Sequence, residues 1–460
     1  MSDYQTFLAT KRRVLHDCGR IADPGEIHES LFPFQRAITT WALRKGRAAI
    51  FADTGLGKTR MQVEWARLTG ERALILAPLA VAHQTIAEAA RMGVEVVYAR
   101  RQIEAGPGIT ITNYERLEGF DPAAFGAVVL DESSILKSFS GTTKKALVKM
   151  FAATPWRLAC TATPAPNDLE ELCNHAHFLG VMAPSEMRST FFIADSRGEF
   201  MKYRLKGHAK GAFFRWLSSW AMAVKRPSDL GFEDDGFDLP GLEIVAHFVE
   251  SDYQPSDRLF ITEMKGITEQ AAVRKATLPD RVAKTVELVR AEPDESWLVW
   301  RGLIEEGRQV AAGIPGAVLV EGKDDPDEKA ARLLDFAEGR TRVLVTAASI
   351  AGFGLNFQRC ARMAFVGLGY SYEQYYQSLR RCHRFGQTRK VEAHIVLSDI
   401  ERSVLNAVLD KERQAAELSG GLLAQVVEYE RAEIFGGTSM GDDYEPRQPL
   451  TLPEWMRETA

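Results

Sequence analysis

The chain has 460 residues, more than a single hydrophobic core usually serves, so two or more domains are expected. Its formal net charge of −5 excludes a global basic field as the means of holding nucleic acid, and leaves only local basic patches for that purpose. No apolar run approaches the roughly 18–20 residues of a membrane span, the first residues lack the layout of a signal peptide, and the five cysteines are scattered. We therefore expect a cytoplasmic protein with free thiols and no membrane partner.

The first half of the chain alternates short apolar runs with helical patterns. This alternation predicts a parallel sheet that is covered by helices on both faces. The predicted strands are 48–51, 73–77, 109–112, 128–130 and 157–160, and helices are predicted at 60–68 and 82–92.

A glycine-rich loop, Ala-Asp-Thr-Gly-Leu-Gly-Lys-Thr at 52–59, joins the first predicted strand to the first predicted helix. Gly55 and Gly57 allow the backbone N–H groups to curl around an anion, and the helix N-terminus adds partial positive charge. Lys58 would reach the β- and γ-phosphates, and the Thr59 hydroxyl would hold Mg²⁺. The loop therefore predicts a nucleoside triphosphate site. Its expected binding residues are Thr54, Gly55, Leu56, Gly57, Lys58 and Thr59.

Two carboxylates, Asp131 and Glu132, follow the apolar run at 128–130. An Asp-Glu pair after a strand is common. It becomes informative here because the glycine-rich loop at 52–59, called the phosphate loop below, precedes it in the same domain. We assign Asp131 to the Mg²⁺ ion and Glu132 to activation of the attacking water.

The group Cys173, His175 and His177 raises the question of a metal site. A metal site needs a fourth ligand and a convergent spacing, and neither is visible. We therefore interpret these residues as part of a helix, with His177 packed or capped.

The segment 183–241 differs from its surroundings and is predicted to be mostly helical, ending in an acidic, turn-rich linker at 231–240. It combines basic side chains with aromatic ones. We favour core packing for the aromatic residues Phe213, Phe214, Trp216 and Trp220. For the basic residues we favour a DNA-facing patch over a solvated face, and contacts of this kind carry no sequence code. The proposed DNA contacts are Arg204, Lys206, Lys210, Lys225 and Arg226.

A second block of alternating strands and helices follows. Strands are predicted at 297–300, 317–320, 343–345, 363–366 and 394–397, and helices at 327–338 and 372–381. After residue 418 the strand periodicity is lost, and from Gly436 onward we expect a loosely ordered tail.

Arg381 and Arg384 lie three residues apart and would share one face of a helix end. A pair of fixed guanidiniums can stabilise the charge that develops on a transferred phosphoryl group. A basic helix that faces solvent or nucleic acid explains the same residues equally well at this point.

Taken in chain order, these motifs resemble the core of superfamily-two helicases, and within it the SWI/SNF-type DNA translocases. The sequence 131–137 is similar to that group's D-E-x-H-x-x-K element, and 111–115 to I-T-x-Y-E. The sequence 161–167 is similar to T-x-T-P-x-x-N, and 383–387 to H-R-x-G-Q. The resemblance covers roughly residues 31 to 410.

The resemblance implies an α/β fold of two tandem RecA-like P-loop lobes with an insert between them. The expected organisation is an N-terminal segment at 1–30, a RecA-like ATP-binding lobe at 31–182, a helical insert and linker at 183–241, a second RecA-like lobe at 242–418 and a C-terminal tail at 419–460.

The resemblance also implies roles for further residues. Gln35 would recognise the adenine edge. Thr161, Thr163 and Gln377 would couple the nucleotide state to lobe movement. Gly352, Gly354 and Asn356 would face the inter-lobe cleft and the DNA, with Gly354 and Asn356 binding the nucleotide. Arg381 and Arg384 would be arginine fingers that reach the nucleotide held by the other lobe.

Three motifs depart from the family pattern. The family's D-E-M-G-L-G-K-T loop is Ala-Asp-Thr-Gly-Leu-Gly-Lys-Thr here, the usual His of the D-E-x-H element is Ser134, and Arg380 replaces the common Gly before Arg381. None removes a residue that ATP hydrolysis needs, but Ser134 weakens one expected link between the metal site and the motif around Thr161.

The resemblance thus implies a translocase that uses ATP and Mg²⁺ to move along double-stranded DNA without sequence preference, as a monomer that a protein partner can recruit. The chain looks like the small stand-alone forms of bacterial and phage genomes, which would place it at the nucleoid or in the cytoplasm of a phage-infected host. One alternative is a strand-separating helicase or the motor subunit of a restriction or repair complex. The other is a non-catalytic DNA-binding scaffold, which would be expected to lose Lys58, Glu132 or Arg384; all three are present.

Overall fold

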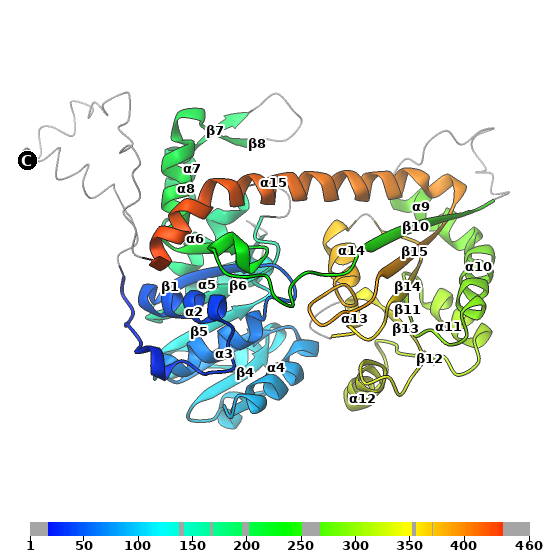
Figure 1. The fold of residues 1–460 in the computed structure, drawn as a ribbon, viewed down its shortest axis with the longest axis horizontal. Coiled ribbons are helices and arrows are strands. Elements are labelled where there is room, and N and C mark those ends of the chain that lie inside the picture. The colour runs from blue at the N-terminus through cyan, green and yellow to red at the C-terminus, as the bar shows by residue number, and fades with distance from the viewer. Residues whose placement is uncertain are drawn as a thin grey trace, which may run out of the picture.

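The structure, a computed structural model, describes residues 17–137, 142–165, 169–195, 202–250, 267–351, 356–369 and 371–435. Two parallel sheets form the centres of two lobes, which lie side by side in Figure 1. The expected α/β architecture of two lobes is confirmed.

The first sheet has the strand order β3-β4-β2-β5-β6-β1-β9, and all its described pairs are parallel. Its strands are almost wholly buried, which explains why they are continuous apolar runs rather than alternating patterns. They are β1 (Arg47–Ala52), β2 (Ala73–Ala77), β3 (Val96–Tyr98), β4 (Ile109–Asn113), β5 (Ala127–Asp131), β6 (Trp156–Cys160) and β9 (Ala221–Val224).

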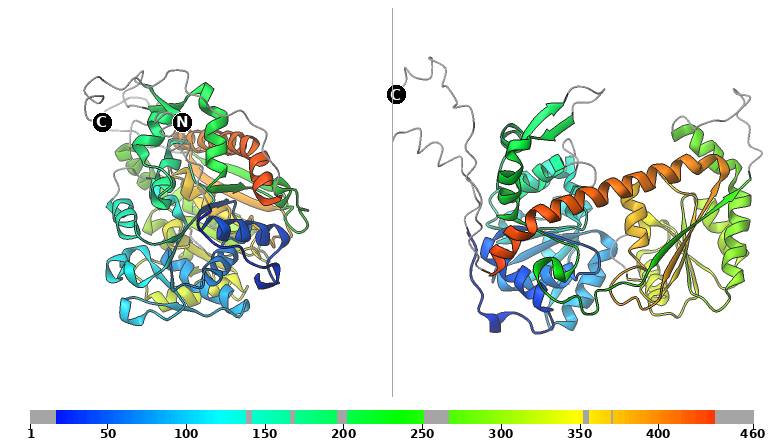
Figure 2. Two further views of the ribbon diagram at one scale, coloured as in Figure 1. Left: turned by 90° about the vertical axis from the view of Figure 1, so that its left-hand side faces the viewer. Right: turned by 45° about the horizontal axis from the view of Figure 1, so that its top comes forward.

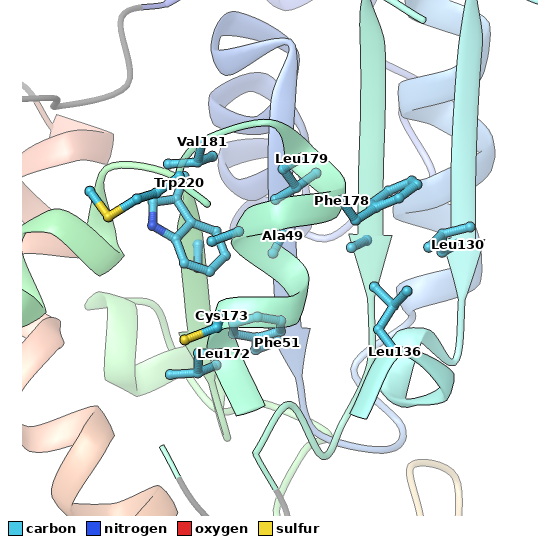
Figure 3. Packing of buried hydrophobic residues seen from close by; sticks show 14 of the residues in the cluster. Ala49, Phe51, Leu130, Leu136, Leu172, Cys173, Phe178, Leu179, Val181 and Trp220 are labelled. Atoms are coloured by element: carbon cyan, nitrogen blue, oxygen red, sulfur yellow. The ribbon is translucent and has the colours of Figure 1, made fainter. Parts of the chain in front are cut away.

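Helices cover both faces of this sheet, and each face has its own hydrophobic core. One core includes side chains of α2 (Pro33–Lys45), α3 (Lys58–Leu68) and α4 (Leu79–Arg91). The other includes side chains of α5 (Thr142–Met150), α6 (Leu172–Leu179) and α8 (Lys210–Ser218). Figure 3 shows part of this second core around α6, where Phe178 and Leu179 pack near Ala49 and Leu130.

The second sheet has the order β10-β15-β14-β11-β13-β12, again with parallel pairing. Its strands are β10 (Leu242–Val249), β11 (Trp297–Arg301), β12 (Val318–Leu319), β13 (Val343–Ala347), β14 (Arg362–Val366) and β15 (Val391–Ser398). The helices of this lobe are α9 (Ile267–Ala276), α10 (Leu278–Ala291), α11 (Ile304–Gly313), α12 (Pro326–Ala337), α13 (Ala348–Ala351) and α14 (Tyr372–Leu379).

Short 3-10 helices connect many of these elements. They are η1 (Pro24–Glu26), η2 (Gln102–Glu104), η3 (Tyr114–Gly119), η4 (Pro122–Ala124), η5 (Ser133–Lys137), η6 (Leu169–Glu171), η7 (Gly207–Ala209), η8 (Pro227–Leu230) and η9 (Asp399–Glu401).

The segment 183–241 is not the mostly helical insert that the sequence predicted. After α7 (Pro184–Phe191) the chain forms an antiparallel hairpin of β7 (Phe192–Asp195) and β8 (Lys202–Leu205). After α8 it returns to the first sheet as β9, which pairs with β1. The aromatic side chains of α8 are buried as expected, and Trp220 is fully buried. Much of the segment therefore belongs to the first lobe.

The last helix, α15 (Arg402–Phe435), corrects the boundary that was expected at residues 418 and 419. The helix passes through this boundary and through Gly420 and Gly421 without a break. It begins on the second lobe and packs against α8, β9 and α2 of the first. The right-hand view of Figure 2 shows this long helix running from one lobe to the other. The second lobe is therefore connected to the first by α15 as well as by the linker before β10. The expected loose tail from Gly436 lies outside the described residues.

Within the described part of the chain, no helix is long and apolar enough to cross a membrane. All five cysteines are free.

Candidate nucleotide site between the lobes

The glycine-rich loop has the backbone that the sequence predicted. It follows β1 and leads into α3, and Gly55 and Gly57 have positive φ angles of 89° and 77°. A Cβ atom on Gly57 would lie 2.3 Å from the Gln35 Nε2 atom. The Lys58 ammonium donates to the carbonyls of Ala52 at 2.8 Å and Asp53 at 3.2 Å, so the loop wraps around it. The positive φ angles at Gly55 and Gly57, and the Gln35 atom close to Gly57, explain why glycine is required in this loop.

Gln35 is tied to this loop. Its Nε2 atom donates to the Leu56 carbonyl at 2.9 Å, and its Oε1 atom accepts from the Phe32 N–H at 3.0 Å. The side chain is only 2% exposed. Gln35 therefore caps the start of α2 and also holds the phosphate loop. Its third position in the helix could have suggested the first of these roles but not the second. Recognition of adenine by Gln35 stays a prediction.

Asp131 and Glu132 lie at the carboxyl end of β5. The Asp131 Oδ1 atom accepts from Gln62 Nε2 at 2.7 Å and from the Glu132 N–H at 3.0 Å. The Tyr114 hydroxyl donates to the Asp131 carbonyl at 2.6 Å. Gln62 and Tyr114 hold the carboxylate pair, and no sequence pattern signalled either contact.

Glu132 has a φ angle of 50°, and no other non-glycine residue in the described ranges has a positive φ. Such a conformation costs on the order of 1–3 kcal/mol and is concentrated at functional sites. The strained backbone thus marks Glu132, which the sequence assigned to water activation, as a candidate functional residue.

The two carboxylates share a buried electrostatic environment with cations from both lobes. Burial raises the pKa of Asp131, and the Gln62 hydrogen bond and the charges of Lys58 and Arg381 oppose this shift. Burial also raises the pKa of Glu132, where Lys58 opposes the shift and Asp131 adds to it. Neither carboxylate is therefore isolated from positive charge.

Arg381 and Arg384 reach this environment from the second lobe, although not from a shared helix face. Helix α14 ends at Leu379, two residues before the predicted end, so both arginines lie in the turn that follows. Burial lowers the pKa of Arg381 to about 10, and Glu132 and Asp131 act in the opposite sense. Burial and Arg381 lower the pKa of Arg384 to about 9, while Glu88 and Glu132 oppose this shift. Both guanidiniums thus interact with first-lobe carboxylates.

This set of residues fits a triphosphate and its Mg²⁺ ion. The Thr59 hydroxyl and the Asp131 carboxylate are oxygen ligands of the kind that Mg²⁺ prefers, and this ion usually completes its shell with phosphates and water. Lys58, Arg381 and Arg384 supply the cations that a triphosphate requires.

The structure describes some, but not all, of the residues that are expected to couple the lobes or to face the cleft between them. Thr161 is buried, and its Oγ1 atom accepts from the Thr163 N–H at 3.1 Å. Gln377 is buried on α14. Asn356 precedes Phe357, whose N–H donates to the Arg381 carbonyl at 2.9 Å. Gly352 and Gly354 lie outside the described residues, and the coupling roles stay predictions.

Ser134, where the family has His, forms a contact that the sequence did not predict. Its hydroxyl donates to the Glu373 Oε1 atom at 3.1 Å, so it links the loop after β5 to α14 of the second lobe. The neighbouring Ser133 hydroxyl lies 3.1 Å from the Nε2 atom of His175, which is fully buried against Phe51. His175 is thus a packed helical residue, and no cluster of three metal-binding side chains was found in the described ranges.

The five proposed DNA contacts lie on β8, on α8 and in the connections that follow β8 and β9. Arg204 on β8 and Lys210 at the start of α8 are exposed. The Lys206 ammonium instead donates to the carbonyls of Ser189 and Thr190, at 2.7 and 3.1 Å, and so satisfies the end of α7. Lys225 and Arg226 are exposed after β9, at the same sheet edge as the phosphate loop.

Comparison with known proteins gives three findings. Residues 308–386 match the helicase conserved C-terminal domain. Over 452 residues the chain is 23% identical to the mouse (Mus musculus) DNA annealing helicase and endonuclease ZRANB3, covering 85% of this chain and 41% of the relative. It is 22% identical to the cattle (Bos taurus) protein of the same name, covering 82% and 39%. The chain thus spans about two fifths of the length of these curated relatives.

Among solved structures, the SWI2/SNF2 ATPase core of Sulfolobus solfataricus in complex with double-stranded DNA matches with a TM-score of 0.41 and 18% identity. This match covers 90% of the chain and 99% of that structure.

Proposed function

We propose that this chain, a SWI/SNF-like protein of helicase superfamily two, hydrolyses ATP between its lobes in order to translocate on double-stranded DNA. The observation that carries the proposal is the electrostatic coupling of Arg381 with Asp131 and Glu132, because these residues come from different lobes. A site that two lobes complete makes hydrolysis depend on lobe closure, and lobe closure can move a bound polymer.

Each residue has a chemical role in this proposal. Lys58 and the loop N–H groups would bind the phosphates, and Thr59 and Asp131 would hold the Mg²⁺ ion, which would supply charge neutralisation to the phosphates. Glu132 orients the attacking water. Arg381 and Arg384 stabilise the charge on the transferred phosphoryl group, which is the contribution of arginine fingers.

DNA is the proposed track because the curated relatives are named as DNA enzymes and because the first lobe exposes basic side chains. Arg204, Lys210, Lys225 and Arg226 are exposed in a chain of net negative charge. Backbone contacts of this kind hold DNA without reading its sequence.

The test is ATP hydrolysis measured without nucleic acid and with single-stranded DNA, duplex DNA or RNA. We expect the duplex to stimulate hydrolysis most. Equal rates under all four conditions would contradict the proposal. Displacement of a third strand from a triplex, without unwinding of a fork, would separate translocation from strand separation.

Strand annealing is a second candidate reaction, favoured by the name that both curated relatives carry. It requires the same motor, because rewinding follows when a duplex-tracking protein moves toward a fork. An assay that follows the annealing of complementary strands with ATP, and with the Lys58→Ala variant, distinguishes it from passive pairing on a basic surface.

A further inference from the structure

A chain of polar contacts connects the phosphate loop to the linker between the lobes, and it uses residues that the proposed chemistry does not. It begins at Asp53, the second residue of the phosphate loop. The Asp53 Oδ1 atom accepts from its neighbour's N–H, that of Thr54, at 2.6 Å. It also accepts from the hydroxyl of Tyr376 on α14 of the second lobe, at 2.7 Å.

The contact between Asp53 and Tyr376 has a defined direction. Burial and the Asp53 charge raise the pKa of the Tyr376 hydroxyl, so it stays protonated and donates. A hydrogen bond to a charged acceptor is stronger than one between neutral groups. The loop that is expected to hold the phosphates is thus bound directly to the helix that leads into Arg381.

Arg380 extends the chain. Its guanidinium lies 5.0 Å from the centre of the Tyr376 ring and 3.9 Å from the Asp53 Oδ2 atom. Its NH1 group also lies 3.2 Å from the Nδ1 atom of His383. Arg380 therefore contacts the first lobe and the turn that contains both proposed arginine fingers.

His383 completes the chain at the linker. Its Nε2 atom lies 2.7 Å from the Pro240 carbonyl, which can only accept, so Nε2 carries the proton. The Nδ1 atom is then the acceptor for Arg380. The neutral tautomer with its proton on Nε2 satisfies both contacts. His383 thereby joins the turn after α14 to Pro240, two residues before the start of β10.

A second contact on α14 supports the same assignment. Glu373, three residues before Tyr376, accepts from Ser134 in the loop after Asp131 and Glu132. Residues three apart share a helix face, so this face of α14 contacts both nucleotide motifs of the first lobe. In the turn after α14, the Phe385 backbone nitrogen would lie 3.0 Å from a Cβ atom on Gly55, so this turn also lies against the phosphate loop.

We propose that Tyr376, Arg380 and His383 form a relay of positioning residues, which holds Arg381 and Arg384 at the phosphate loop and connects this placement to the linker at Pro240. The role rests on the proposed ATP hydrolysis, but the relay itself is a property of the lobe interface. Its members position other side chains and do not contact the nucleotide.

The kinetic test is Tyr376→Phe, which removes one hydroxyl. Its matched control is Tyr375→Phe on the same helix, because the Tyr375 hydroxyl is buried and has no hydrogen-bond partner among the residues that the structure describes. We expect Tyr376→Phe to lower the duplex-stimulated kcat by about tenfold, the effect of losing a hydrogen bond to a charged group. Affinity for a fluorescent ATP analogue should be unchanged, because Lys58 and the loop remain. Equal kcat values for the two variants would overturn the proposal.

A second kinetic test asks whether the residues act together. If Tyr376 and Arg380 belong to one relay, the double variant Tyr376→Phe/Arg380→Met should be no slower than the slower single variant. Additive losses would show that each residue acts alone, and would contradict the relay.

A structural readout separates this proposal from the proposed function. Spin labels at Ile103→Cys in the first lobe and Leu334→Cys in the second, in a Cys18→Ser background, report the inter-lobe distance. Both label sites are exposed, and Cys18 is an exposed free thiol. We expect the distance distribution to broaden in Tyr376→Phe but not in Tyr375→Phe. Absence of hydrolysis in the wild-type chain would contradict the proposed function alone, whereas identical distance distributions would overturn the relay.

Discussion

The Glu430 carboxylate on α15 accepts a hydrogen bond of 2.6 Å from the backbone N–H of Ala223 on β9. A side chain of α15, the helix that begins on the second lobe, thus contacts the edge strand of the first sheet. It accepts from the Ala223 N–H group, which would otherwise lack a partner at that edge. The Glu430 side chain is nearly fully buried, and within the described part of the chain its Oε2 atom has no hydrogen-bond partner.

Glu430→Gln is predicted to stabilise the protein at alkaline pH. Burial raises the pKa of Glu430 well above 4.5, so the native state binds this proton more tightly than the unfolded state. The stabilisation is fully present below pH 4.5 and is lost as pH rises through the native pKa. The glutamine variant carries no charge and should avoid this loss, with a gain of about 1–3 kcal/mol in the free energy of unfolding near pH 8.

Thermal unfolding measured from acid to alkaline pH checks this prediction. The control is Glu428→Gln, because Glu428 is exposed on the same helix. A wild-type stability profile that matches the Glu430→Gln profile at every pH would show that the buried carboxyl does not titrate as argued.

Much of the fold could be predicted because its strands are buried on both faces. Such strands are short apolar runs, and β2 at Ala73–Ala77 has the predicted bounds. The strand β9 was missed because its place in the sheet depends on pairing with β1, which lies far away in the sequence. Helix α15 was not predicted: a tail was expected from residue 419, where the helix instead continues through Gly420 and Gly421. In the structure its packing against the first lobe overrides the weak helix propensity of glycine.

In the candidate site, too, residues of local motifs could be predicted, whereas contacts between distant residues could not. Lys58, Asp131 and Glu132 belong to local motifs whose chemistry follows from residue type and spacing. The Tyr376–Asp53 hydrogen bond joins residues 323 positions apart, and no local pattern marks either one as a partner. Contacts between lobes depend on how two complete folds dock, so the supporting residues were found only in the structure.

Lys58→Ala and Arg384→Ala are each predicted to abolish ATP turnover for different reasons. Loss of Lys58 removes the ammonium held inside the loop by Ala52 and Asp53, so binding of ATP should fail. Loss of Arg384 should leave binding largely intact and lower kcat by about 10³-fold or more, the effect expected if Arg384 acts as an arginine finger. Binding of a fluorescent ATP analogue and steady-state hydrolysis distinguish the two, and retained turnover in either variant would refute the role assigned to that residue.

Gly57→Ala is predicted to disable nucleotide binding, through crowding rather than through backbone strain alone. The φ angle of 77° costs a non-glycine residue about 1–2 kcal/mol, and the added Cβ would also lie 2.3 Å from Gln35 Nε2. Gly70→Ala is the matched control, because Gly70 has a φ angle of 71° and no atom of the described residues lies within 4 Å of the position that its added methyl group would occupy. Both variants should lose similar backbone stability, but only Gly57→Ala should lose ATP binding. Equal binding by the two variants would show that the Gln35 contact yields without cost.

Acidification is predicted to loosen the lobe interface through His383. Burial lowers the pKa of His383, and the positive charge of Arg380 lowers it further. The Pro240 carbonyl and the Asp53 carboxylate oppose this shift. Because the native pKa is below 6.5, the native state binds this proton less tightly than the unfolded state, so the stabilisation is fully present above pH 6.5 and is lost as pH falls through the native pKa. A proton on Nδ1 would remove the acceptor of Arg380 and place two cations side by side. The inter-lobe distance between labels at positions 103 and 334 should broaden on acidification in the wild-type chain. In His383→Asn, which cannot titrate, the distribution should be independent of pH over the same range, and broadening of equal size in both proteins would assign the effect to other groups.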